Sequence, residues 1–378
     1  MDAATAILTS PETVPLPTAN SRPSTSYSVI SSESCHEAKE QILGLMRSNF
    51  SWRDEAEVWY RWAYEQSPYS ANRCWFVETA NCQRVGFTSL MPRRMQVDGR
   101  GCDVGQAANL NVLAEHRGSA AAVKLQRAVT AHVDDSELAF AFGITRNAVA
   151  VQRRAGYHDL GTFSRWIKLF RTEHKLRRFI PWNGPRRAVA GALDIGLRLG
   201  AAETWRRLPQ GWQVQHEPAF DERFDELWEA AAPNSGITTE RTSQYLNWRF
   251  GLDPQRQYRT LAVQDERGRL RGYAIYLYPD PEQKLPFGAI VDLLAVDRVA
   301  LDALLPALCS HLRRGGAYGV QLLSLTSPFV EASLKHAGFF RRESDFHLLV
   351  HLHPSLKSRE AELLDPRRWH LIEAEAKF

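Results

Sequence analysis

The chain has 378 residues, of which 44% are hydrophobic and 24% charged, a balance that excludes a disordered or fibrous protein. Its net charge of +4 arises from 47 basic and 43 acidic residues, so charge alone indicates no nucleic-acid partner. The length favours two domains of roughly 150 residues with additional tails.

The amino-terminal residues 1–34 are rich in Ser, Thr and Pro and lack both a basic start and an apolar run, which predicts a disordered tail rather than a signal peptide. The longest apolar stretch, AVAGALDIGLRLGAA, is interrupted by Asp194 and Arg198, whereas a membrane-spanning helix needs about 20 apolar residues. The cysteines are scattered and form no Cys-x-x-Cys pair, which favours reduced thiols, no metal and a cytoplasmic location. They are Cys35, Cys74, Cys82, Cys102 and Cys309.

Two stretches of the chain repeat the same order of elements, namely helix, turn, strand, hairpin and strand. The first contains YRWAYEQSPYS, CWFVETA and RVGFTSLMP, and the second contains YLNWRFGLDPQRQY, RTLAVQD and LRGYAIYLYP. In both, a Trp precedes a Pro by six residues and a Gly by 24 residues, at Trp62, Pro68 and Gly86 and again at Trp248, Pro254 and Gly272. The matched spacing predicts an internal repeat.

Each copy continues through strands and helices in alternation. Short apolar runs predict strands at DVGQAANLNVL, ELAFAFGI, AIVDLLAV and GVQLLSL, and helical segments are expected at VKLQRAVTAHV and ALDALLPALCSHLRR. Both copies end in Ala-Gly-aromatic, at Gly156-Tyr157 and at Gly338-Phe339. We therefore expect an α/β protein. Its expected parts are a tail (1–34), a first domain (35–170), a helical linker (171–215), a second domain (216–355) and a C-terminal tail (356–378).

The segment between the copies is basic, with eleven Lys or Arg and three Asp or Glu from Arg165 to Arg207. One interpretation is a solvated helical linker whose arginine stems cover apolar surface. The alternative is a basic amphipathic element that rests on anionic lipid.

A turn of small residues, AEHRGSAAAVKLQ, follows the strand QAANLNVL and opens a helix. Small side chains allow backbone amides to face a pyrophosphate, the helix N-terminus adds about half a positive charge, and Arg117 can add a full one. These residues resemble the signature of the GCN5-related N-acetyltransferases (GNAT), which is Arg or Gln, two residues, Gly, one residue, then Gly or Ala. The matching positions are Arg117, Gly118, Ser119, Ala120, Ala121 and Ala122, with Ala120 where the family usually has Gly.

The resemblance implies two acyl-CoA N-acyltransferase (GNAT-like) domains, each a mixed, mostly antiparallel sheet flanked by helices. It implies acetyl-CoA or another acyl-CoA as co-substrate of the first copy, with Val112 and Leu113 at the thioester carbonyl and Asn147 after the next strand. The second copy has AVDRVALDALLPAL at the equivalent turn, where Asp297 would repel a pyrophosphate. The second copy is therefore expected to be degenerate and to shape the acceptor site.

The catalytic groups are less evident. Many relatives carry a base on the strand before the turn, where this chain offers Asp103, and Asp292 has a comparable place in the second copy. Asp292 has a purely structural interpretation as well. Gln152 stands where many relatives have a thiolate-protonating Tyr. Three histidines, at positions 347, 351 and 353, share one strand face but span roughly 20 Å, so a shared metal ion is not expected.

The leading hypothesis is an N-acyltransferase that moves an acetyl group from CoA to a primary amine. The Ala- and Arg-rich composition suits a bacterial source, and by analogy the amine would belong to an amino-sugar or cell-envelope precursor in polysaccharide biosynthesis. Two alternatives stay open, a long-chain N-acyl amino acid synthase and a non-catalytic scaffold that binds a partner or acyl carrier. The oligomeric state is left open.

Overall fold

The computed structural model describes residues 26–32, 35–49, 55–69, 72–217, 219–279 and 287–376. Its first half contains nine strands and helices before the connecting segment, besides β1 (Tyr27–Ser32). These are α1 (Lys39–Asn49), α2 (Ala56–Tyr60), β2 (Arg73–Thr79), β3 (Arg84–Val97), β4 (Arg100–Val112), α3 (Ala121–Asp134), β5 (Phe140–Thr145), α4 (Val149–Arg154) and β6 (His158–Leu169). Three helices connect the halves, α5 (Glu173–Leu176), α6 (Asn183–Leu199) and α7 (Ala202–Trp205).

The second half repeats this order with additions. It contains β7 (Gln213–Glu217), α8 (Glu222–Ala231), β8 (Thr238–Thr239), α9 (Ser243–Leu246), β9 (Arg259–Gln264), β10 (Leu270–Leu277), β11 (Phe287–Ala295), α10 (Arg298–Arg314), β12 (Gly319–Leu325), α11 (Pro328–His336) and β13 (Phe340–Leu352). The described chain then closes with α12 (Glu360–Leu363), β14 (Leu371–Ile372) and α13 (Glu373–Ala376). No helix among these elements is long and apolar enough to cross a membrane.

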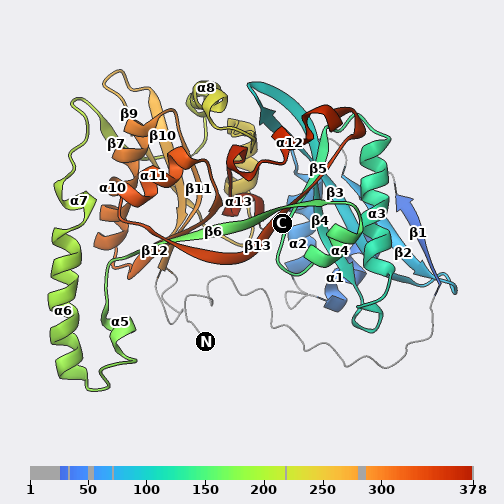
Figure 1. The fold of residues 1–378 in the computed structure, drawn as a ribbon, viewed down its shortest axis with the longest axis horizontal. Helices are drawn as coiled ribbons and strands as arrows, with labels where there is room; N and C mark the ends of the chain where they lie inside the picture. Colours follow the sequence, from blue (N-terminus) through green and yellow to red (C-terminus); the bar gives the residue numbers. More distant parts are fainter. Residues whose placement is uncertain are drawn as a thin grey trace.

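The described strands form one continuous sheet (Figure 1). Its order is β1-β2-β3-β4-β5-β13-β6-β12-β11-β10-β9-β7, with β8 beside β3 and β14 beside β12. The pairs β4–β5 and β11–β12 are parallel, and the other pairs are antiparallel. The expected α/β fold with mixed, mostly antiparallel sheets flanked by helices is therefore confirmed.

The last strand of each half lies in the other half. The first half's β6 pairs with β12, while the second half's β13 pairs with β5, and β6 and β13 pair with each other at the centre. The two expected sheets are thus joined through exchanged strands, which cross the middle of the molecule in Figure 1. The expected domain boundaries at residues 170 and 216 stay a proposal, since each half needs the other half's last strand to complete its sheet.

Both segments that we expected to be tails contain ordered structure. Inside the range 1–34, Tyr27–Ser32 forms β1 and pairs with β2, and residues 1–25, 33 and 34 lie outside the described part. Inside the range 356–378, Trp369, Leu371 and Ile372 are fully buried. The tail interpretation was wrong for these residues because their few apolar side chains fill space created by distant parts of the chain.

Helices cover both faces of the sheet. Along β2, Trp75 and Val77 belong to the core under α3, whereas Cys74 and Phe76 face the opposite core with α1 and α2. This second core also contains the α8 side chain of Phe224 and residues of β10, so the two halves share it. The second half's own core lies under α10 and α11.

The two tryptophans that defined the sequence repeat contact each other at the centre of the shared core. Each lies in a short π-helical turn, Arg61–Glu65 or Asn247–Gly251. Their rings stack with centroids 5.6 Å apart. The Trp62 Nε1–H donates to the Trp248 carbonyl at 2.9 Å, and the Trp248 Nε1–H donates to the Trp62 carbonyl at 2.8 Å. The repeat therefore marks the contact by which one half recognises the other.

Replacing one of these rings is expected to destabilise the whole molecule. Trp248→Ala should lower the free energy of unfolding by about 3–5 kcal/mol, because it leaves a cavity and removes the Trp248 Nε1–H that donates to the Trp62 carbonyl. Urea denaturation followed by circular dichroism measures this change. Trp182→Ala is the control, since that ring is solvent-exposed and its loss should stay within about 0.5 kcal/mol. A loss below about 1 kcal/mol for Trp248→Ala would contradict the proposed role of the pair.

Candidate functional site

The parallel strands β4 and β5 separate part-way along their length. They pair only at Gly105–Ala141 and Gln106–Phe142, although β4 continues to Val112 and stays paired with β3. A register shift in β3 between Phe87 and Ser89 coincides with a positive φ of 56° at Asn109, which marks a β-bulge in β4. The β5-facing edge of β4 beyond Gln106 therefore has no strand partner in the described part of the chain.

The alternation of backbone groups identifies which amides face this opening. The Leu113 N–H donates to the Val85 carbonyl of the neighbouring segment at 2.8 Å, so it points away from β5. Successive residues of a strand direct their N–H groups to opposite edges, and the Val112 N–H therefore points into the opening. Of the two predicted thioester contacts, Val112 keeps a usable amide, whereas the Leu113 prediction was wrong because its amide is committed to the sheet.

The small-residue turn follows the C-terminal end of β4, beside the same opening, and leads into α3. Gly118 has a φ of 77°, and a side chain there would meet no atom within 4 Å, so the turn is open to solvent. The Ser119 hydroxyl donates to the His116 carbonyl and accepts from the Ala121 N–H at 3.2 Å. Ala120 is the N-cap of α3 and offers no capping side chain. A 14-residue helix thus begins with amides that its own N-cap does not satisfy.

Arg117 has a different place from the one that we expected. Its Nε–H donates to the Val112 carbonyl at 3.1 Å, and its Nη2 donates to the Asn49 side chain at 2.9 Å. The guanidinium therefore ties the turn to the end of β4 and to α1. It contributes positive charge beside the turn while it fixes the turn's position.

A large cavity lies between the two halves beside the N-terminal part of β4. Its volume is about 1010 Å³, and charged side chains from both halves line it. Those from the first half include Arg73, Arg94 and Asp103, and those from the second half include Asp225 and Glu240. Gly105, the first residue of β4 that pairs with β5, is part of the wall, so the cavity adjoins the point where the strands separate.

Glu240 is the most perturbed carboxyl group of this cavity. Burial raises its pKa above the ordinary value for glutamate, and nearby Asp103 adds to the effect. The Tyr69 hydroxyl donates to its Oε1 at 2.8 Å, which orients the carboxylate. No sequence pattern singled out Glu240, because it follows a two-residue strand, β8, that joins the sheet only through β3 of the other half.

Comparisons with known proteins agree with this geometry. Residues 34–159 match the family described as "Acetyltransferase (GNAT) domain". This part of the chain is a GNAT domain. Comparison with curated proteins found no match.

Solved structures resemble nearly the whole chain in fold. A GCN5-related N-acetyltransferase from Anabaena variabilis aligns with a TM-score of 0.63 and 13% identity, over 88% of this chain and 75% of that one. A probable N-acyltransferase from Enterococcus faecalis aligns with a TM-score of 0.59 and 12% identity, over 87% and 72%. N-myristoyltransferase from Saccharomyces cerevisiae, solved with myristoyl-CoA, aligns with a TM-score of 0.52 and 14% identity, over 89% and 81%. At these identities the likeness establishes the fold alone.

The GNAT domain brings together most of the residues predicted to hold CoA. Val112 and the turn from Arg117 to Ala122 form one side of the opening, and Asn147 follows β5 on the other side. Gln152 lies at its base, since its side-chain amide packs against Gly143, the residue after the last β4–β5 pair. Its Nε2 donates to Gln126 on α3, and its Oε1 accepts no hydrogen bond from the described residues.

The two aspartates proposed as bases lie elsewhere. Asp103 is nine residues from Val112, roughly 30 Å along the strand, and it lines the cavity rather than the turn. Asp292 is 0% exposed and accepts hydrogen bonds from Arg241 and from the Tyr273 hydroxyl. An enclosed and fully paired carboxylate cannot reach a substrate, so the structural interpretation of Asp292 holds.

In the second half, the opening that corresponds to the one between β4 and β5 is filled by the chain itself. There β11 and β12 also separate, but β14 occupies the edge of β12, with Ile372 opposite Ser324 and Leu371 opposite Leu325. Asp297 caps α10 by accepting from the Ala300 N–H at 2.8 Å. The chain's own residues thus fill the place that remains open in the GNAT domain.

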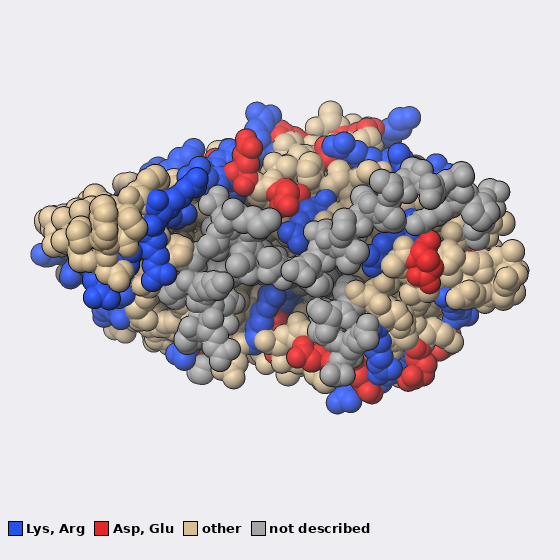
Figure 2. Space-filling view, turned by 90° about the horizontal axis from the view of Figure 1, so that it is seen from below, with Lys and Arg blue, Asp and Glu red and all other residues tan. Residues whose placement is uncertain are grey.

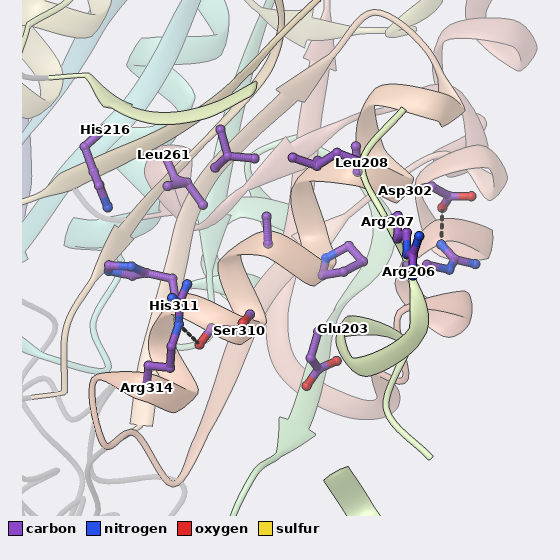
Figure 3. Close-up of a pocket in the computed structure, with 14 residues that line it drawn as sticks. Glu203, Arg206, Arg207, Leu208, His216, Leu261, Asp302, Ser310, His311 and Arg314 are labelled. Atoms are coloured by element: carbon purple, nitrogen blue, oxygen red, sulfur yellow. Dashed lines mark hydrogen bonds and ion pairs between the residues drawn. The ribbon is translucent and has the colours of Figure 1, made fainter. Parts of the chain in front are cut away.

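A smaller cavity of about 360 Å³ lies between α7 and α10 (Figure 3). His216 and His311 lie at one end of it, and Arg206, which pairs with Asp302, lies at the other. The three strand histidines examined for metal binding have separate partners, Asp159 for His347, Asp134 for His351 and Ser355 for His353. They do not converge on one site.

Proposed function

We propose that the chain is an N-acyltransferase that transfers an acetyl group from acetyl-CoA to a primary amine. The observation that carries the proposal is the opening between β4 and β5, which ends at the N-terminus of α3. An extended molecule can use the edge of β4, and an anionic group is favoured at the helix N-terminus.

The residues present fit such a co-substrate. The backbone of the Gly118–Ala122 turn would hold the pyrophosphate, and Ala120 adds only a methyl group at the helix start. The Val112 N–H would donate to the thioester carbonyl oxygen, where an oxyanion donor is worth about 3 kcal/mol of barrier. Asn147 would contact the thiol-bearing arm from the β5 side, whereas Gln152 is buried and would support the opening from within the core.

We propose that the acceptor amine binds in the cavity between the halves. An amine is protonated in water, and the carboxylates of Asp103, Asp225 and Glu240 attract it. The acceptor must lose a proton before its nitrogen attacks the carbonyl carbon, but Glu240 lies beside Asp103, far along β4 from Val112, so its carboxylate would attract the protonated amine into the cavity rather than act as the base. Asp103 then serves at the acceptor side rather than at CoA.

The charged lining favours a polar acceptor such as an amino sugar or another envelope precursor, in keeping with a cytoplasmic bacterial enzyme. The alternatives are a long-chain N-acyl amino acid synthase and a scaffold without turnover. A fold shared with a myristoyl-CoA-binding protein keeps the long chain under consideration. The polar cavity favours the acetyl group.

Calorimetry with acetyl-CoA and longer acyl-CoA species is the decisive first experiment. We expect acetyl-CoA to bind with a dissociation constant in the micromolar range and mass spectrometry of an amine panel to detect an added acetyl group. Failure of every CoA species to bind below about millimolar would refute the proposal. Preference for long acyl chains would favour the alternative enzyme, and binding without any product would favour the scaffold.

Glu240→Gln tests whether this carboxylate attracts the acceptor. In the wild type, kcat/KM for the amine should fall as the pH drops through the raised pKa of Glu240, because protonation removes the negative charge, so the acidic limb lies above the range of an ordinary glutamate. The variant should raise KM for the amine about tenfold near neutral pH, keep kcat and lack this limb. The control Glu229→Gln changes an exposed carboxylate outside the cavity and should leave the profile unchanged. An unaltered acidic limb in Glu240→Gln would exclude Glu240 as the group that attracts the amine.

A further inference from the structure

Helix α6 presents its apolar side to solvent. Eight of its exposed apolar or small residues recur at i, i+3, i+4, i+7, i+8, i+10, i+11 and i+14, which places them on one face of the helix. They are Pro185, Ala188, Val189, Ala192, Leu193, Ile195, Gly196 and Leu199. A surface helix of a globular protein ordinarily turns such a face to the core. In α6, by contrast, the apolar face points to solvent.

The polar side of α6 holds the helix to the protein. Only Arg186 and Ala190 are buried, and with Asp194 they form a line at i, i+4 and i+8 on the opposite face. Asp194 accepts hydrogen bonds from the backbone N–H and the hydroxyl of Thr172, at 2.7 and 2.8 Å. The outward position of the apolar face is therefore fixed by specific contacts.

Large aromatic side chains extend this apolar face at both ends. Phe179 and Trp182 precede α6 and are 76% and 72% exposed, and Trp205 of α7 is 70% exposed. The Trp205 Nε1–H donates to the Leu199 carbonyl, which ties that ring to the end of α6. The helix is about 25 Å long, so apolar residues form a continuous strip at one end of the molecule. We call residues 175–207 the α6 surface.

The charges around the strip are positive. Arg177, Arg178, Arg198 and Arg207 are exposed and form no ion pair with any described residue. The three acidic residues of the segment are engaged inside the chain, Glu173 with Arg186 and Arg187, Asp194 with Thr172, and Glu203 with Lys168 and Arg313. Figure 2 shows the uncharged surface at this end bordered by Lys and Arg.

We propose that the α6 surface docks onto the face of an anionic lipid bilayer. An apolar strip with Trp at its ends and Arg along its sides is typical of a helix that lies in the plane of the membrane interface. In that position the Trp rings insert at the boundary between headgroups and acyl chains, and the guanidinium groups contact lipid phosphates. A second copy of the chain would bring the same unpaired cations to the contact and would be repelled, so charge favours the bilayer. The docking is independent of acyl transfer.

Vesicle co-sedimentation of the full chain tests the proposal. We expect binding to vesicles with 30% phosphatidylglycerol at low salt, weak binding to pure phosphatidylcholine and release as salt rises. Trp182→Ser with Trp205→Ser should weaken binding at least about tenfold, because it removes both anchors. Arg177→Gln with Arg178→Gln should weaken it about 25-fold, since each surface cation contributes roughly fivefold.

Matched controls separate docking from unfolding and from general charge. Leu252→Ser with Val299→Ser removes exposed apolar residues elsewhere, and Arg100→Gln with Arg267→Gln removes exposed cations elsewhere. Both should bind vesicles within about twofold of the wild type, and all variants should keep their circular dichroism spectrum. Equal binding to neutral and anionic vesicles would contradict the proposed requirement for anionic lipid. Absence of vesicle binding, or a dimer in ultracentrifugation that Trp182→Ser with Trp205→Ser dissolves, would overturn the proposal as a whole.

Discussion

Ala120→Asp is expected to abolish acyl-CoA binding without weakening the fold. Ala120 is the N-cap of α3 and has a φ of −70°, so the new side chain needs no unusual backbone conformation. The αR backbone of Ala120 does not allow the ordinary N-cap hydrogen bond, but a carboxylate beside the helix N-terminus should still raise the free energy of unfolding by about 0.5 kcal/mol. The same carboxylate repels a pyrophosphate at the turn, and we expect the dissociation constant to rise at least about 100-fold. Calorimetry and urea denaturation measure the two opposite effects.

Because the affinity for acyl-CoA should fall while the free energy of unfolding rises, unfolding cannot explain the loss of binding. Gly118→Asp should also prevent binding, but a φ of 77° strains any side chain and would confuse the two effects. Val299→Asp is the matched control, because it places a carboxylate in the first turn of α10, the corresponding helix of the second half. It should leave binding unchanged. If Ala120→Asp binds acetyl-CoA within about threefold of the wild type, the turn is not the pyrophosphate site.

The parts of the fold that were predictable are those encoded by local pattern. The turn from Arg117 to Ala122 was recognisable because small residues before an amphipathic stretch specify a helix start within a few residues. The Trp62 and Trp248 repeat was recognisable because equal spacing recurs wherever the same supersecondary unit is used twice. Its meaning, a reciprocal contact between the halves, required the structure.

The parts that could not be predicted depend on pairings between distant segments. The exchange of β6 and β13 leaves no trace in either strand's own pattern, since a strand with the same residues could pair with either half. The C-terminal residues Leu371 and Ile372 are buried only because β11 has left the edge of β12 open. Glu240 is brought to Asp103 by the packing of β8 on β3, and neither residue stands in a motif.

Asp292→Ala is expected to cost about 3–5 kcal/mol of unfolding free energy, because it leaves a buried cation without its main partner. Arg241 is fully buried and donates to Asp292 through Nε and Nη2, at 3.2 and 3.0 Å from Oδ1. Burial alone would lower the pKa of Arg241, yet the carboxylates of Asp292 and Glu375 raise it well above its ordinary value. Arg241 therefore stays charged, and in the variant its Nε–H loses its acceptor and only the Glu375 carboxylate remains to pair with it. Urea denaturation measures the loss.

A triple variant distinguishes this structural role from a catalytic one. Arg241→Met with Asp292→Leu and Glu375→Gln removes all three buried charges and should recover most of the stability, since apolar residues of similar volume often replace a buried ion pair without loss. Both variants should keep the wild-type kcat once it is corrected for the folded fraction, because Asp292 lies in the second half, where β14 fills the opening. A stable Asp292→Ala variant that has lost its kcat would instead restore Asp292 as a catalytic base. Glu375, which also accepts from Arg241, makes the C-terminal segment part of the same network, so in Asp292→Ala this carboxylate would still offset part of the charge on Arg241.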